Sequence, residues 1–336
     1  MIAEHVTDNS PMLQILAISL PFFALVLCGY LAARRRILPL EAVTGLNSFV
    51  LYFALPCMLY RFGADTPILQ LLDPSGALVW TSSAVLLVGF AVAVSLNARI
   101  GWTDAAFGAL VAAFPNTGFM GVPLLVALIG PSAAGPVILT MLIDMLVTTS
   151  LCIGLSRLQD ASAQGPRVAV KQALRGIAVN PLPWSIALGA LSSALGWRLQ
   201  GPLRQTLGML ADAASPVALF TIGAVLARSQ MQAIAQQHPP IPWGDVLPMA
   251  LSKLLLHPLL VLLIGILLRN AGLPLPTPVL TVLVLAAALP SASNVSLLAE
   301  RYGADNGRIA RIILVSTAAA LGSLVPLVHG LLPQRY

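Results

Sequence analysis

Two similar motifs lie in the middle of long apolar segments, and each places a proline before polar side chains. The first is A-A-F-P-N-T at Ala112–Thr117, and the second is A-A-L-P-S-A at Ala287–Ala292. A proline in a membrane helix removes one backbone hydrogen bond and frees a carbonyl one turn earlier. In hydrocarbon these freed groups need protein or water partners. Two matching breaks in corresponding halves of a chain are typical of the binding site of a secondary transporter.

Each break would begin a second half-helix whose N-terminus faces the middle of the membrane. The N–H groups at such an end carry a partial positive charge and favour an anion. Polar side chains that could donate or accept further hydrogen bonds follow each proline. The expected substrate-binding residues are Pro115, Asn116, Thr117, Pro290, Ser291, Ser293 and Asn294. The alternative is a pair of ordinary proline kinks whose polar side chains are satisfied locally.

Four other polar side chains lie inside apolar segments: Asp144, Lys253, His257 and Asn47. A charge inside a membrane is costly and is usually paired and functional, so we predict that Asp144 and Lys253 interact. His257 follows Lys253 by one helical turn and shares its face. These three residues form either a proton-coupling or substrate-attracting site or a structural ion pair, unless Lys253 reaches an interface. Asn47 either bonds to another helix or faces the substrate pathway.

The composition indicates that these residues sit in a polytopic membrane protein. The 336-residue chain is 58% hydrophobic and 9% charged, with a mean hydropathy of +0.89. Soluble domains carry about 25% charged residues. The pI of 9.7 does not indicate nucleic-acid binding, because the charges lie in short loops between apolar segments. No hydrolase, metalloprotease or phosphate-loop motif is found, so we expect neither an enzyme nor a cofactor or metal site.

The apolar segments predict ten membrane-spanning helices, each about 20 residues long. Three proline pairs suggest that the first five helices and the last five are related: Pro21 with Pro183, Pro56 with Pro216, and Pro115 with Pro290, at separations of 162, 160 and 175 residues. An odd number of spans in each repeat makes the two repeats insert in opposite orientations. The expected spans are 12–33, 42–62, 76–98, 105–129, 134–157, 177–197, 205–227, 246–268, 277–299 and 308–331. The expected domains are an N-terminal repeat at 1–157, a connecting loop at 158–176 and a C-terminal repeat at 177–336.

The orientation follows from the Lys and Arg residues in the loops. If the N-terminus is outside, the inner loops hold 12 of the 18 basic residues and the outer segments hold 5, with Lys253 inside a span. Positive residues favour the cytoplasmic side. We therefore expect both termini outside the cytoplasm and the 158–176 loop inside it, in the cell (inner) membrane.

Five motifs, in order along the chain, resemble the bacterial branch of the auxin efflux carrier family. They are N-S-F-V-L-Y-F-A-L-P (Asn47–Pro56), F-P-N-T-G-F-M-G-V-P-L (Phe114–Leu124), S-P-V-A-L-F-T-I-G-A (Ser215–Ala224), K-L-L-L-H-P-L-L (Lys253–Leu260) and A-L-P-S-A-S-N-V-S-L-L-A-E-R-Y-G (Ala288–Gly303). The resemblance covers about residues 12–331. The long cytoplasmic loop of many plant members is absent.

The resemblance implies an all-α fold of ten helices in two inverted five-helix repeats, with broken helices 4 and 9 crossing at the membrane midplane. It also implies a scaffold of helices 1, 2, 6 and 7 beside a mobile transport unit of helices 3–5 and 8–10. The fold of this family is similar to that of bile-acid symporters. Plant members form homodimers, here expected through the scaffold helices. Bacterial relatives are described as malate or malonate carriers and plant ones carry an indole carboxylate, and Asn116 falls at the family's substrate position.

Together these observations predict an elevator-type secondary carrier of small organic anions in a lipid bilayer. One alternative is a sodium- or proton-coupled symporter of the bile-acid type, with Asp144 as the coupling group. Another is a membrane sensor that transports nothing. Saturable uptake into vesicles separates the sensor from the carriers, and its dependence on pH or sodium separates the two carriers.

Overall fold

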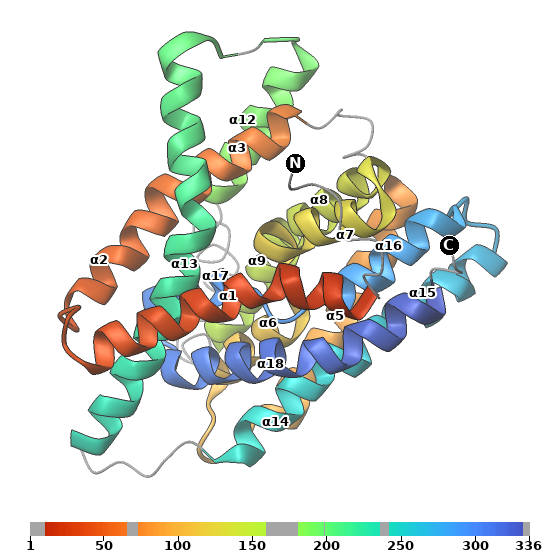
Figure 1. The fold of residues 1–336 in the computed structure, drawn as a ribbon. Helices are drawn as coiled ribbons and strands as arrows, with labels where there is room; N and C mark the ends of the chain where they lie inside the picture. Colours follow the sequence, from red (N-terminus) through yellow and green to blue (C-terminus); the bar gives the residue numbers. More distant parts are fainter. Residues whose placement is uncertain (1–10, 66–72, 159–180, 198, 236–241, 332–336) are drawn as a thin grey trace.

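The computed structural model describes residues 11–65, 73–158, 181–197, 199–235 and 242–331. Within these ranges the chain is helical, and the single β-type contact is an isolated antiparallel bridge between Pro115 and Ser291. Figure 1 shows α1 and α18 side by side across the front of the molecule, with α17 behind them near the centre. The expected cytoplasmic loop at 158–176 lies outside the described residues from position 159 onward.

The helices of the first half lie in the order that the apolar segments predict. Their bounds are α1 Pro11–Arg34, α2 Ala42–Phe49, η1 Val50–Ala54, α3 Leu55–Asp65, α5 Pro74–Ser95, α6 Trp102–Ala113, η2 Thr117–Gly121, α7 Val122–Ile129, η3 Pro131–Ala133, α8 Ala134–Ile143, η4 Asp144–Thr148 and α9 Thr149–Ser156. The segments η1, η2 and η4 are π-helical turns.

The second half follows the same plan. Its helices are α12 Pro181–Ala194, α13 Gly201–Ala235, α14 Trp243–Leu251, η5 Ser252–Leu256, α15 His257–Asn270, α16 Thr277–Ala287, α17 Asn294–Tyr302 and α18 Asn306–Leu331. The segment η5 is again a π-helical turn.

Every one of the ten expected spans overlaps a helix or a pair of broken helices. Five continuous helical stretches in the described residues are long and apolar enough to cross a membrane, and a sixth is obtained if the bent α18 is one span. Helices α12 and α16 are shorter apolar helices. The chain is therefore an all-helical membrane protein, and the number of ten spans and the inverted orientation stay predictions.

Two close helix contacts hold α1, α3, α12 and α13 together. A β-carbon on Gly63 of α3 would collide with the backbone around Ile186 and Gly189 of α12, and one on Gly189 would collide with Tyr60 and Gly63. Small residues let membrane helices approach this closely.

The same arrangement joins α1 to α13. A β-carbon on Gly29 would collide with the backbone of Phe220, and one on Gly223 with that of Val26. Gly29 and Gly189 are 160 residues apart, and so are Gly63 and Gly223. This separation equals that of Pro56 and Pro216. The two contacts are therefore equivalent under a repeat of this length.

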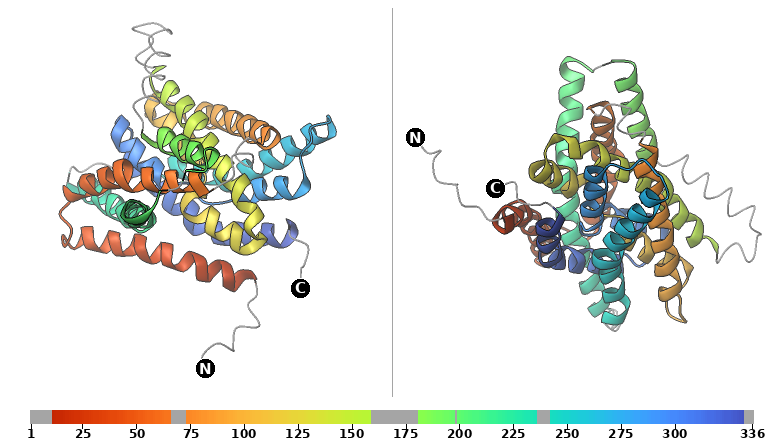
Figure 2. Two further views of the ribbon diagram at one scale, coloured as in Figure 1. Left: turned by 90° about the horizontal axis from the view of Figure 1, so that it is seen from above. Right: turned by 90° about the vertical axis from the view of Figure 1, so that its right-hand side faces the viewer.

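The remaining helices, α5 to α9 and α14 to α18, pack mainly on one another and are described as a second group. Helix α18 also contacts α1 and α13, and the right-hand view of Figure 2 shows it beside α1. Helix α5 packs on α6 and α15, α6 packs on α9, α15 packs on α16, and α18 packs on α14 and α17. Both broken helices lie inside this group. The first consists of α6 followed by η2 and α7, and the second of α16 followed by α17. Buried apolar residues from these helices, from α6 Phe107 to α16 Leu285, surround the two breaks.

Candidate functional site

The two proline breaks meet and hydrogen-bond to each other. The Asn116 N–H donates to the Pro290 carbonyl at 2.8 Å, and the Ala292 N–H donates to the Phe114 carbonyl at 2.8 Å. These two bonds form the antiparallel bridge between Pro115 and Ser291. Each break thus supplies backbone partners to the other, which removes much of the cost of interrupting a helix in an apolar environment. The expectation that the breaks meet is confirmed, and we call residues 114–117 and 290–294 the crossover.

Three buried hydroxyl groups at the crossover have no hydrogen-bond partner among the described residues. They are those of Thr117, Ser291 and Ser293, which are at most 1% exposed. A buried polar atom without a partner is unfavourable, and most such atoms in native proteins are satisfied. A ligand that donates to or accepts from these oxygens would remove the penalty. The locally satisfied proline kinks considered above therefore do not describe these three side chains.

Small cavities open on two sides of the crossover, and Asn116 lines both. The first cavity is lined by Leu55, Met58, Phe114, Pro115, Asn116, Gly118, Met141, Met145, Ala292 and Asn294. The second is lined by Val26, Asn116, Met120, Leu219, Ile222, Ser293, Ile313, Leu314 and Thr317. Among the described residues, neither lining includes a charged side chain. Pro290, Thr117 and Ser291 lie in the crossover but line neither cavity.

The two cavities have corresponding walls. Leu55 and Met58, three residues apart, face the first cavity from the second predicted span, and Leu219 and Ile222 face the second cavity from the seventh. Met141 and Met145 line the first cavity from the fifth predicted span, and Ile313 and Thr317 line the second from the tenth. Each cavity therefore lies between one helix group and the other, with the crossover as its shared wall.

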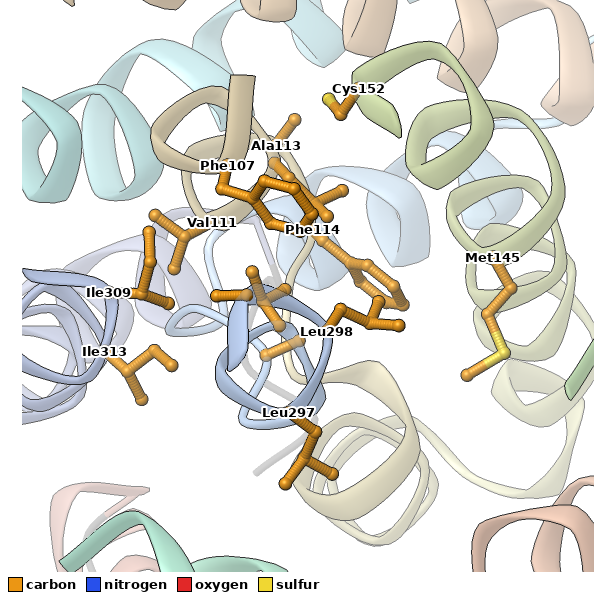
Figure 3. Close-up of a cluster of buried hydrophobic side chains, with 14 of the residues drawn as sticks. Phe107, Val111, Ala113, Phe114, Met145, Cys152, Leu297, Leu298, Ile309 and Ile313 are labelled. Carbon is orange, nitrogen blue, oxygen red and sulfur yellow. The ribbon is translucent and has the colours of Figure 1, made fainter. Parts of the chain in front are cut away.

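Aromatic and aliphatic side chains keep the crossover in place. Figure 3 shows Phe107 and Phe114, from α6 and its C-terminal end, close to Leu298 of α17. Phe114 is 2% exposed, and its carbonyl is the one that accepts from Ala292. Packing of this kind holds the two half-helix N-termini in fixed positions.

Asp144 is fully buried at the first residue of η4. Its Oδ1 accepts hydrogen bonds from Trp80 Nε1 at 3.0 Å and Thr148 Oγ1 at 2.8 Å, while its Oδ2 has no partner among the described residues. π-Helical turns inside α-helices are frequent at functional sites. The carboxyl group is thus positioned by two donors and keeps one oxygen available.

Lys253, on η5, is also fully buried, but it bonds to groups other than Asp144. Its Nζ lies 3.0 Å from His257 Nδ1 and also donates to the Ala287 carbonyl at the end of α16. A cation at a helix C-terminus interacts favourably with the helix dipole. The bond attaches Lys253 to the half-helix that ends just before the crossover.

No ion pair joins Asp144 to Lys253 among the described residues. Their connection passes through Trp80, whose indole donates to Asp144 and whose ring lies 5.1 Å, centre to centre, from the ring of His257. Asp144 and Lys253 still interact electrostatically at longer range, as predicted, and a chain of four side chains links them. Each of the two groups makes its hydrogen bonds to other partners: Trp80 and Thr148 for Asp144, and His257 and the Ala287 carbonyl for Lys253.

Asn47 lies away from both cavities. Its amide donates to Glu300 Oε2, so of the two roles left open the structure shows the interhelical hydrogen bond. Glu300 also accepts from Thr44, Arg228 and Asn306. We call Thr44, Asn47, Arg228, Glu300 and Asn306 the Glu300 cluster.

Sequence reasoning missed Trp80 and Glu300. Trp80 is an apolar residue in an apolar helix, so no pattern separates its indole N–H from ordinary core packing. Glu300 lies in the A-E-R-Y motif near the end of a span, where an acidic side chain is normally solvated. One available signal was its rarity, because the chain has only 12 acidic residues.

The described residues contain no group of three or more His, Cys, Asp or Glu side chains arranged to hold a metal ion. The polar atoms of the site are amides, hydroxyls and backbone N–H groups. These groups suit a carboxylate or another oxyanion by hydrogen bonding.

A helical membrane protein with two interrupted helices crossing at buried polar groups is a member of the transporter class, and the comparisons with known proteins agree. The chain belongs to the membrane transport protein family, which includes auxin efflux carriers and whose model matches residues 15–327. It is therefore a membrane transporter, and this membership favours transport over catalysis or sensing.

Its relatives cover most of the chain. It is 32% identical over 320 residues to the "Putative malonate transporter" of Rhizobium meliloti, covering 95% of this chain and 96% of that protein. It is 26% identical to the uncharacterized transporter YfdV of Escherichia coli, covering 84% of this chain and 87% of the relative. It is 22% identical to auxin efflux carrier component 8 of Arabidopsis thaliana, covering 66% and 74%.

Proposed function

We propose that this protein is a secondary transporter of small organic anions, such as malate, malonate or auxin-like carboxylates, that works by elevator-type alternating access. The observation that carries the proposal is the crossover, where two half-helix N-termini lie with three buried hydroxyls that have no partner among the described residues. The relative from Rhizobium meliloti supports a small carboxylate as cargo.

The chemistry of the cavities favours an anion. The N-termini of η2 and α17 lie at the crossover and carry partial positive charge, although the N–H groups of Thr117, Val295 and Ser296 already donate to nearby backbone carbonyls. The Asn116 and Asn294 amides can donate beside them, and no Asp or Glu lines either cavity. A carboxylate that leaves water here would exchange its hydration for fixed donors.

The contacts between helices support a moving crossover. The backbone-to-backbone contacts at Gly63 with Gly189 and at Gly29 with Gly223 make α1, α3, α12 and α13 a rigid frame. The crossover belongs to the other helix group, whose cavities face this frame. Sliding of that group would carry the bound anion across the membrane, while a homodimer through the frame helices would hold the frame still.

Uptake into liposomes tests the proposal. Purified protein should accumulate radiolabelled malonate, malate or indole acetate with saturation, and unlabelled substrate should compete. Protein carrying Asn116→Ala should lose most of this uptake while remaining monodisperse. Equal uptake by liposomes with and without protein, across the panel of carboxylates, would contradict a carboxylate carrier.

A second candidate, proton-coupled symport, is favoured by the chain of Asp144, Trp80, His257 and Lys253. It ends on the Ala287 carbonyl, three residues before Pro290, so a change of charge in the chain would act on the crossover. Uptake driven by an imposed pH gradient, and lost in Asp144→Asn, would support this candidate. Gradient-independent uptake that survives Asp144→Asn would leave a uniporter.

A further inference from the structure

The last turn of α17 connects the two helix groups. The Glu300 carboxylate accepts from Arg228 on α13 at 2.9 Å, from Thr44 on α2 at 3.2 Å and from Asn47 on α2. It also accepts from Asn306, its neighbour on α18, at 3.2 Å. Helix α2 and η1 pack on α13 and so belong to the frame side. Three of the four donors therefore come from the frame side of the molecule, and one comes from its own group.

The next two residues repeat this division. The Arg301 guanidinium lies 5.6 Å from the ring centre of Tyr52 on η1, which belongs to the frame side. The Tyr302 ring lies 5.8 Å from that of Phe107 on α6, in the crossover group. One helical turn thus fixes α17 to its own group through Tyr302 and to the frame through Glu300 and Arg301.

The same helix begins at the crossover. Helix α17 runs from Asn294, which lines the first cavity, to Tyr302, a length of about 13 Å at 1.5 Å per residue. Such a short helix moves as a rigid rod. The crossover is therefore unable to shift along the frame by more than a fraction of this length while Glu300 and Arg301 keep their partners.

The contact between Arg228 and Glu300 is able to break and form again. The side chains of Arg228 and Glu300 are 14% and 23% exposed, so water has access to both charges when they separate. A fully buried pair would leave uncompensated charges on separation, at a much higher cost. Partial exposure therefore allows the pair to form in one state and lowers the cost of separating its charges in another.

We propose that Glu300 is a positioning residue of the transport cycle: its contacts with Arg228, Thr44 and Asn47 hold the crossover against the frame in the state described here, and they must release before the crossover moves. This inference rests on the proposed function. Weakening the contacts shifts the population toward the other state.

Crosslinking tests the proposal without knowledge of the substrate. The variant carries Tyr52→Cys and Arg301→Cys, two exposed positions, with Ala292→Cys as a reporter in the first cavity and with Cys28, Cys57 and Cys152 changed to alanine. A short bifunctional thiol reagent, added while the reporter is reversibly blocked, joins positions 52 and 301. Impermeant thiol reagents then probe the reporter from each side of proteoliposomes.

The uncrosslinked protein should be labelled from both sides, and the crosslinked protein from one side only. A matched control joins Arg99→Cys to Asp245→Cys, two positions within the crossover group. In the parent protein the Arg99 guanidinium lies 3.5 Å from Asp245 Oδ1. That crosslink should leave labelling from both sides. Two-sided labelling after the 52–301 crosslink would overturn the role of Glu300, whereas one-sided labelling before any crosslink would overturn alternating access itself.

Charge variants test the same point without a crosslinker. Glu300→Gln should increase reporter labelling at least threefold from the side on which the crosslinked protein is not labelled. Arg228→Glu should do the same. The exchange of both charges, Arg228→Glu with Glu300→Arg, should return labelling toward the parent rate. In uptake, Glu300→Gln should change the maximal rate with the apparent affinity kept within twofold, whereas Asn116→Ala should change the affinity. No difference between Glu300→Gln and the parent in either assay would overturn the proposal.

Discussion

The crossover and the Glu300 cluster lie at opposite ends of α17, and they differ in how their polar atoms are paired. At the crossover, the hydroxyls of Thr117, Ser291 and Ser293 have no partner among the described residues. In the Glu300 cluster, one carboxylate receives four donors, and among the buried side-chain atoms of the described residues only the Asn47 carbonyl oxygen of this cluster lacks a partner. The hydroxyls of the crossover keep hydrogen-bonding capacity for a ligand, whereas the groups of the Glu300 cluster mainly bind the protein to itself.

The largest expected effect comes from comparing an asparagine of the crossover with an asparagine of the Glu300 cluster. Asn116→Ala removes a donor to a desolvated carboxylate, which costs about 1.5–3 kcal/mol, or roughly 10- to 150-fold in affinity. Alanine keeps the local helix and Pro115 keeps the break, so the protein should fold. The measurement is concentration-dependent uptake in liposomes.

The matched control for this variant is Asn47→Ala, in the Glu300 cluster. It should leave the apparent affinity within about threefold and instead lower the midpoint of thermal unfolding, because its amide bonds to the protein. If the two variants change affinity equally, the distinction between the regions is wrong.

The next effect concerns Asp144 and the side chains linked to it, because one carboxylate oxygen of Asp144 is paired and the other has no partner among the described residues. Trp80→Phe keeps the aromatic packing but removes a hydrogen bond to Asp144, leaving Thr148 as its donor. Losing a bond to a buried charged group costs about 1.5–3 kcal/mol. Thermal unfolding in detergent should report this loss. Adding Asp144→Asn to Trp80→Phe should restore part of the stability, since a neutral amide is less costly to bury; a fully additive double variant would argue against the link.

A smaller effect compares two threonines. Thr117→Val removes a hydroxyl with no partner, so it should weaken uptake modestly without lowering stability. Thr44→Val removes a donor to Glu300 and should cost about 0.5–1.5 kcal/mol of stability. Unfolding midpoints and uptake affinities of the two purified variants give the comparison. A large loss of stability in Thr117→Val would mean that its hydroxyl has a structural partner.

The smallest effect comes from a third polar contact. Arg61 and Asp212 form a 2.7 Å ion pair, but the Asp212 side chain is 71% exposed. Exposed pairs contribute about 0.2–1 kcal/mol and are screened by salt. Asp212→Asn should therefore shift neither uptake nor the unfolding midpoint by more than this, and the shift should vanish at high salt. A shift as large as that of Thr44→Val would place this pair with the Glu300 cluster.

The sequence predicts the parts of the site that backbone chemistry determines. Pro115 and Pro290 lack an N–H, so breaks there are unavoidable, and their similar contexts predict that they meet. Helix positions follow from apolar length for the same reason. The partners of Asp144 and Lys253 do not follow, because the sequence gives the helix face of each residue but not the rotation of one helix against another. The Trp80 hydrogen bond to Asp144 therefore has no sequence signal, and Arg228, one of the 12 basic residues counted in the inner loops, is found to bind Glu300.

The glycine contact between α1 and α13 has a consequence for how the chain is made. Gly29 and Gly223 are 194 residues apart, and the ribosome adds about 5–20 residues per second. Helix α1 is therefore synthesised about 10–40 s before the surface that fits its glycine face exists. During that interval α1 must persist as a separate membrane helix, and its glycine face is open to any other small-residue helix nearby. Slowing synthesis between residues 34 and 201 would lengthen this interval and should lower the yield of assembled protein.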